Sequence, residues 1–200
     1  MELSNSVVIA CHQGHADVAQ VIRVVLELFQ LGLSFRVHFH LCVRKSDVLE
    51  LLGGHISDSQ YVVLCVGGNN TMDEPMKMVF NVVDEVGGEE SPAQVVLTPE
   101  NVPELVRLPG RTVIALGCGT GREPFAESFL KAGCGAYIGP EGPVDQDSDT
   151  MFTIAFFYYL LRGAVDPTVS FTVEEAARKA ADLDRESREG TWVFRYYSRR

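Results

Sequence analysis

The chain has 200 residues, of which 46% are hydrophobic and 22% are charged. These proportions are typical of a globular protein and exclude a wholly disordered chain, a collagen-like chain and a coiled coil. The 17 basic and 27 acidic residues give a net charge of −10, which disfavours contact with phosphate backbones, so we expect no nucleic-acid partner. The length favours a single domain over residues 1–200.

The sequence shows no feature that points to a membrane or to a secreted protein. The longest apolar run, residues 151–161, is shorter than the roughly 20 residues that a membrane span needs. The first residues lack the basic segment of a signal peptide, so we expect a cytoplasmic protein. The cysteines are odd in number and widely spaced, without a CxxC pair, which predicts reduced thiols and neither a metal nor another cofactor. They are Cys11, Cys42, Cys65, Cys118 and Cys134.

The hydrophobic pattern predicts strands that alternate with helices. In chain order, the predicted strands are residues 7–11, 35–43, 61–66, 94–97, 112–116, 135–138 and 191–197. The predicted helices are residues 18–31, 46–52, 73–86, 124–132, 147–161 and 173–186, with a further helix start at 98–100 and a polar turn at 87–91. This order predicts an α/β three-layer sandwich, with a mostly parallel sheet and helices on both faces.

Ligands of such sheets bind beyond the carboxyl ends of the strands. Four predicted loops lie at this edge, namely residues 11–15, 67–70, 117–121 and 139–149. Residues that bind or transform a ligand are therefore expected in these four loops.

Residues 112–121, Thr-Val-Ile-Ala-Leu-Gly-Cys-Gly-Thr-Gly, resemble the nucleophile segment of caspase-like cysteine peptidases of the CHAT type. Those families place a cysteine just after a buried strand, often in a Ser-Ala-Cys-x-Thr-Gly pattern. Residues 125–135, 143–150, 156–163 and 173–180 are similar to later segments of the family, in the same order. The resemblance implies a caspase-like fold with Cys118 at the nucleophile position. In an active enzyme the Gly119 amide would lie in the oxyanion hole.

The sequence departs from the family where the catalytic histidine is expected. That histidine normally ends the strand before the nucleophile strand, about 50 residues before the cysteine in caspases. Here Gly67, Gly68 and Asn69 occupy this turn, without a histidine. His12 and His15 follow the first predicted strand, which a caspase-like sheet places beside the third, so they are the candidate replacement bases. His38, His40 and His55 are predicted to be exposed.

The acidic residues after the strand at 135–138 have two interpretations. In caspase-like enzymes this region helps to form the substrate groove. The resemblance thus implies that Glu141, Asp145 and Asp147 contact a ligand together with the 67–69 turn, and that they favour a basic side chain. Alternatively, these carboxylates form the acidic N-terminus of the next helix, with Ser148 or Asp149 as its cap.

Three functions remain open from the sequence. The first is a degenerate caspase-like or CHAT-like domain that binds a protein or peptide at the strand carboxyl ends, without peptidase activity. The second is an active cysteine endopeptidase that uses Cys118 with His12 or His15 as its base. The third is a flavodoxin-like binder of a nucleotide or another small ligand, with the glycine-rich 117–121 loop and Arg122 near a phosphate. The spacing of that loop differs from GxGxxG, and no Walker lysine follows it. Nothing in the sequence specifies an oligomeric state.

Overall fold

The computed structural model describes residues 4–30, 33–56, 58–68, 75–86, 89–187 and 194–199. Asn69, a predicted ligand-binding residue, lies outside these ranges. The same is true of residues 191–193 at the start of the last predicted strand.

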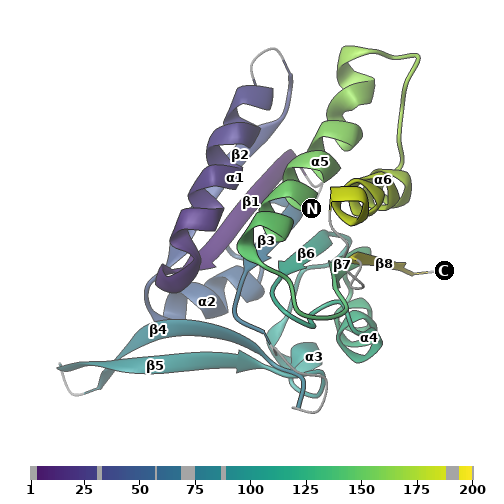
Figure 1. The fold of residues 1–200 in the computed structure, drawn as a ribbon. Helices are drawn as coiled ribbons and strands as arrows, with labels where there is room; N and C mark the ends of the chain where they lie inside the picture. The colour runs from purple at the N-terminus through teal and green to yellow at the C-terminus, as the bar shows by residue number, and fades with distance from the viewer. Residues whose placement is uncertain are drawn as a thin grey trace.

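A six-stranded sheet with the strand order β2-β1-β3-β6-β7-β8 forms the centre of the protein (Figure 1). Its first five strands are parallel, and β8 runs antiparallel to β7. The strands are β1 (Ser4–His12), β2 (Arg36–Cys42), β3 (Ser59–Cys65), β6 (Thr112–Leu116), β7 (Ala136–Pro140) and β8 (Phe194–Ser198). The β1, β3, β6 and β7 strands are almost continuously buried, as their apolar sequences predict for strands covered on both faces.

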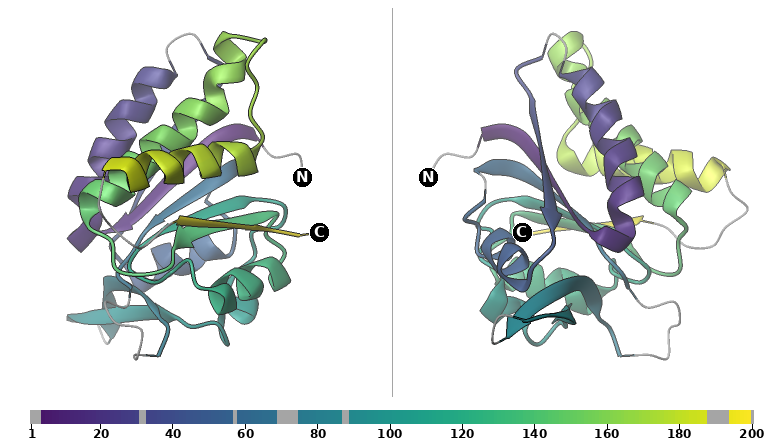
Figure 2. Two further views of the ribbon diagram at one scale, coloured as in Figure 1. Left: turned by 45° about the vertical axis from the view of Figure 1, so that its right-hand side comes forward. Right: turned by 90° about the vertical axis from the view of Figure 1, so that its left-hand side faces the viewer.

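Two layers cover the sheet (Figure 2). One layer consists of α1 (Ala16–Phe29), α5 (Gln146–Val165) and α6 (Val173–Ser187), whose buried residues pack with Val7, Ile9 and Cys11 of β1. The other layer contains α2 (Lys45–Leu52), α3 (Val102–Leu105) and α4 (Glu123–Lys131), which pack on the side of Val8 and Ala10. The predicted three-layer α/β sandwich is thus confirmed. Among the described helices, none is both long and apolar enough to traverse a bilayer.

The prediction of a helix at residues 73–86 is wrong for the described residues. Residues 78–86 form β4 (Met78–Val86), which pairs antiparallel with β5 (Glu89–Leu97) in a separate two-stranded sheet. The physical reason is a period of two, since Met78, Phe80 and Val82 are buried whereas the residues between them are not. Residues 89–91, predicted as part of a turn, belong to β5.

The helix start predicted at 98–100 lies slightly too early. The backbone N–H of Thr98 donates to Oδ1 of Asn101 over 2.8 Å, which closes a turn before α3 begins at Val102. An Asn side chain that bonds a nearby backbone group in this way favours a turn over a helix.

Candidate functional site

Cys118 lies in the short loop that joins β6 to α4, at the carboxyl edge of the sheet. Gly119 follows with a φ of +71°, a backbone conformation that glycine adopts without strain. Side chains hold this loop in place. Oγ1 of Thr120 donates to the carbonyl oxygen of Ala115 over 2.8 Å, and the Tyr137 hydroxyl donates to the carbonyl oxygen of Thr120 over 2.8 Å.

The thiol of Cys118 is hydrogen-bonded to the backbone of Val144 in both directions. The Val144 N–H donates to Sγ over 3.5 Å, and the thiol donates to the Val144 carbonyl oxygen over 3.4 Å. The Gly119 amide, the predicted oxyanion donor, donates instead to the carbonyl oxygen of Gly142 over 2.9 Å. Residues 141–145, which we call the covering loop, are therefore hydrogen-bonded to both the Cys118 thiol and the Gly119 amide.

The glycine turn after β3 lies directly against Cys118. A Cβ atom built on Gly68 would come within 2.2 Å of the carbonyl oxygen of Cys118, so a side chain at this position requires backbone movement. Gly67 pairs with Val79 of β4 through two backbone hydrogen bonds of 2.9 and 3.1 Å. Caspase-like peptidases place their catalytic histidine in this turn. Here its described residues, Gly67 and Gly68, lie directly against the backbone of Val79 and Cys118.

His12 and His15 lie at the same edge of the sheet but bond to each other. Nδ1 of His15 and Nε2 of His12 are 2.8 Å apart, and Nδ1 of His12 accepts a hydrogen bond from the N–H of Gly14. The His12 ring packs edge-on against Phe80, on the face that carries α2 and α4. Because β3 lies between β1 and β6, these two strands are two strand spacings apart, each of about 4.8 Å. Within the described residues, neither imidazole is hydrogen-bonded to Cys118.

The hydrogen bonds of the histidine pair determine its protonation. The N–H of Gly14 can only donate, so Nδ1 of His12 is unprotonated and Nε2–H donates to His15. A proton added to either accepting nitrogen would break a hydrogen bond. Burial, followed by the nearby His15, lowers the pKa of His12 to about 4, and burial lowers the pKa of His15. Both imidazoles are therefore neutral at pH 7.

The three predicted acidic ligand residues make structural contacts or face solvent. Glu141 forms an ion pair with Arg195, with Oε2 and Nε 2.9 Å apart. Oδ1 of Asp145 accepts a hydrogen bond from the backbone of Ser148, so Asp145 is the cap of α5 in place of the predicted Ser148 or Asp149. Asp147 is exposed in the first turn of α5. No group of three potential metal ligands occurs among the described residues.

The geometry gives no support to a phosphate site in the 117–121 loop. The amides of Gly119, Thr120 and Gly121 donate to backbone carbonyl oxygens at residues 142, 117 and 140. Nε of Arg122 donates to the carbonyl oxygen of Glu141 over 3.3 Å. A phosphate would therefore have to replace hydrogen bonds that the protein already makes, which costs free energy.

A cleft that the sequence does not predict lies at the carboxyl ends of β1 and β2. It has a volume of about 660 Å³ and lies between these strand ends and the β4–β5 hairpin. Its lining includes Gln13, Leu41, Val43, Asn81 and Pro92. Strand alternation predicts that Leu41 and Val43 are buried. Their exposed fractions are nevertheless 40% for Leu41 and 48% for Val43. Because residues 73–86, which include β4, are predicted as a helix, the sequence pattern does not reveal the opposite wall of the cleft.

Comparison of the sequence with protein-family models and with curated proteins finds no match. Comparison of the structure with solved structures finds a chain of the separase–securin complex from Saccharomyces cerevisiae. The TM-score is 0.53 and the sequence identity 14%, over 99% of this chain and 12% of that chain. The similarity supports a caspase-like fold. This chain spans about an eighth of the length of that relative.

The neutral histidine pair makes the fold sensitive to mild acid. Below pH 6.5 an exposed histidine of the unfolded chain gains a proton, whereas folded His12 stays neutral until about pH 4. The contribution of neutral His12 to the free energy of unfolding is therefore fully present above pH 6.5. It decreases by roughly 2–3 kcal/mol as the pH falls from 6.5 to 4.

Urea unfolding at pH 7.0, 5.5 and 4.5 measures this loss. The His12→Asn variant retains an acceptor for Gly14 and removes the titrating ring, so we expect a clearly smaller loss across the same range. An equal loss in both proteins would contradict the assignment of a neutral, buried His12.

Proposed function

We propose that this chain is a caspase-like domain without peptidase activity that binds a protein or peptide at the carboxyl edge of its sheet. One observation carries the proposal. The thiol at the nucleophile position bonds to the backbone of Val144, and it has no imidazole hydrogen-bonded to it among the described residues. A cysteine nucleophile needs a base that holds it as a thiolate and a donor that stabilises the oxyanion. Here the Gly119 amide is engaged by Gly142.

The cleft beside β2 and β4 supports the binding role. Its volume lies within the range of small-molecule and side-chain pockets, and Leu41 and Val43 offer apolar surface to a ligand. The net charge of −10 favours a ligand with basic residues, through complementary potentials. The similar solved chain was crystallised in a complex with a protein, securin, which is consistent with this role.

Alkylation of the cysteines tests the absence of a catalytic base. Cys118 is partly exposed and the other four thiols are buried, with burial raising the pKa of Cys11 to about 11 and of Cys42 and Cys134 to about 12. Iodoacetamide at pH 7 should therefore modify Cys118 first. We expect the His15→Gln variant to react within about twofold of the native rate, because His15 is not bonded to the thiol.

Mass spectrometry after timed quenching gives the rate at each cysteine, and His12→Asn provides the same test for the second histidine. A tenfold slower reaction of Cys118 in either histidine variant, with the fold intact by circular dichroism, would contradict the proposal. That result would show that an imidazole activates the thiol.

Selection of peptides from a random display library tests the binding role. We expect the enriched peptides to carry Lys or Arg next to an apolar residue, and Val43→Glu to weaken their binding at least tenfold, through lost apolar contact and lost burial. Leu49→Glu is the matched control, since Leu49 is similarly exposed on α2 but does not line the cleft. Enriched peptides that bind Val43→Glu as tightly as the native chain would contradict the cleft as the site.

A further inference from the structure

We propose that the outer surface of α1 and α5 docks a second copy of this chain in a twofold symmetric dimer. This inference is independent of the function proposed above. The surface, which we call the α1–α5 face, is defined by six apolar residues that are half to three-quarters exposed. They are Val21, Val24 and Leu28 on α1, and Met151, Tyr158 and Val165 on α5.

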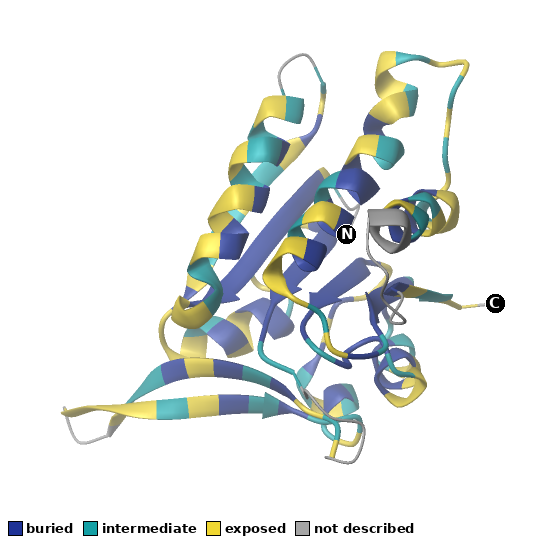
Figure 3. Cartoon of the chain, in the orientation of Figure 1, coloured by how far each residue is buried: buried dark blue, intermediate teal, exposed yellow. Residues whose placement is uncertain are grey.

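The six residues form two stripes that lie side by side. The α1 residues recur after three and four positions, and the α5 residues recur after seven, so each set lies on one side of its helix. Both helices follow parallel strands and therefore start at the same edge of the sheet (Figure 1). Exposed residues alternate with buried ones along both helices in Figure 3, as expected of helices that bury one face only.

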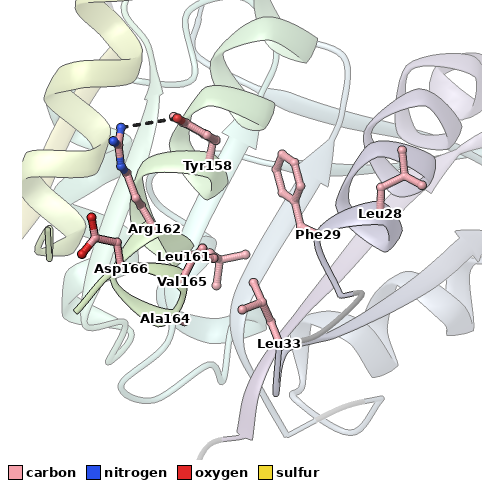
Figure 4. Close-up of a pocket in the computed structure, with 9 residues that line it drawn as sticks. All are labelled: Leu28, Phe29, Leu33, Tyr158, Leu161, Arg162, Ala164, Val165 and Asp166. Carbon is pink, nitrogen blue, oxygen red and sulfur yellow. Dashed lines mark hydrogen bonds between the residues drawn. The ribbon is translucent and has the colours of Figure 1, made fainter. Parts of the chain in front are cut away.

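An apolar hollow deepens this face near the C-terminal ends of the two helices (Figure 4). It has a volume of about 740 Å³, with Leu28, Phe29 and Leu33 on one side and Tyr158 and Val165 on the other. Contiguous exposed apolar surface of this kind marks interaction sites in proteins. Arg162 and Asp166 also line the hollow, so a partner that fits it must offer apolar groups together with a charge that pairs with one of them.

The sequence of α5 favours a second copy as that partner. Met151 and Tyr158 lie at equal distances from the point between Ile154 and Ala155. The exposed charges Asp147 and Arg162 lie symmetrically about the same point. A twofold axis through this point would run the two α5 helices antiparallel, with Met151 against Tyr158 of the second copy. The same arrangement would bring Asp147 close to Arg162 of the second copy, so the face is complementary to itself.

The size of the face suits a stable dimer. The 20 residues of α5 and the 14 of α1 are about 30 and 21 Å long, and packed helix axes lie about 8–10 Å apart. Such a face covers roughly 460 Å² on each copy in projection, close to half of the roughly 1,000 Å² in total that specific interfaces exceed. The net charge of −10 on each copy opposes association, so apolar burial provides the attraction and the Asp147–Arg162 pairs set the register.

Sedimentation velocity of the full chain between 2 and 200 µM tests the proposal. We expect a monomer–dimer equilibrium with a dissociation constant of about 10 µM or tighter. Val24→Glu and Val165→Glu place a charge in the centre and at one end of the face, and each should weaken the dimer at least tenfold. Leu49→Glu, on the opposite side of the sheet, should leave it unchanged.

A charge exchange tests the twofold register. Asp147→Arg and Arg162→Asp should each weaken the dimer about fivefold, and the double variant should restore it to within about twofold of the native value. The proposal is overturned by a monomer at 200 µM, by a dimer that Val24→Glu and Val165→Glu leave intact, or by a double variant that fails to restore association. Circular dichroism of every variant separates loss of association from loss of folding.

Discussion

The hydrogen bonds between the Cys118 thiol and the Val144 backbone determine which groups of this site are available to a ligand. It joins the loop after β6 to the loop after β7, and the Gly119–Gly142 hydrogen bond reinforces it. The contact depends on close approach of three strand ends. A Cβ on Gly68 would lie 2.2 Å from the Cys118 carbonyl oxygen, and one on Gly121 would lie 1.9 Å from that of Gly139. Side chains at these glycines would force the strand ends apart.

This arrangement separates the elements that cysteine catalysis combines. The Cys118 thiol is hydrogen-bonded to the backbone of Val144. His12 and His15 are hydrogen-bonded to each other at the end of β1, which β3 separates from β6. Both nitrogens of His12 are hydrogen-bonded, and in neutral His15 Nδ1 accepts from His12 while Nε2 carries the proton, so neither ring has a free acceptor for a thiol proton. The cleft beside β2 and the α1–α5 face, which we propose as binding surfaces, both expose apolar side chains.

The central position of β3 and β6 is predictable from the sequence, because strands buried on both faces have continuous apolar runs. The β4–β5 hairpin is not predicted from the sequence because residues 73–86, which include β4, are predicted as a helix, whereas only residues 94–97 of β5 are predicted as a strand. The sequence alone shows that Gly67 and Gly68 stand where the family has its histidine.

The partners of Cys118 could not be predicted. Val144 lies 26 positions away, and its contact depends on the path of the covering loop. The Gly-Pro-Glu-Gly-Pro run at 139–143 predicts a turn there, but it does not specify which carbonyl oxygen meets which amide. Likewise, the acidic cluster predicted a capped helix, whereas the choice of Asp145 as the cap required the backbone dihedral angles.

A crystal structure of the reduced protein tests the central claim most directly, through the distances from Sγ of Cys118 to its neighbours. We expect the Val144 nitrogen within about 3.5 Å of Sγ and no imidazole nitrogen within hydrogen-bonding reach of it. An imidazole nitrogen at roughly 3–4 Å from Sγ, with the covering loop displaced, would contradict it and would identify an active thiol–imidazole pair.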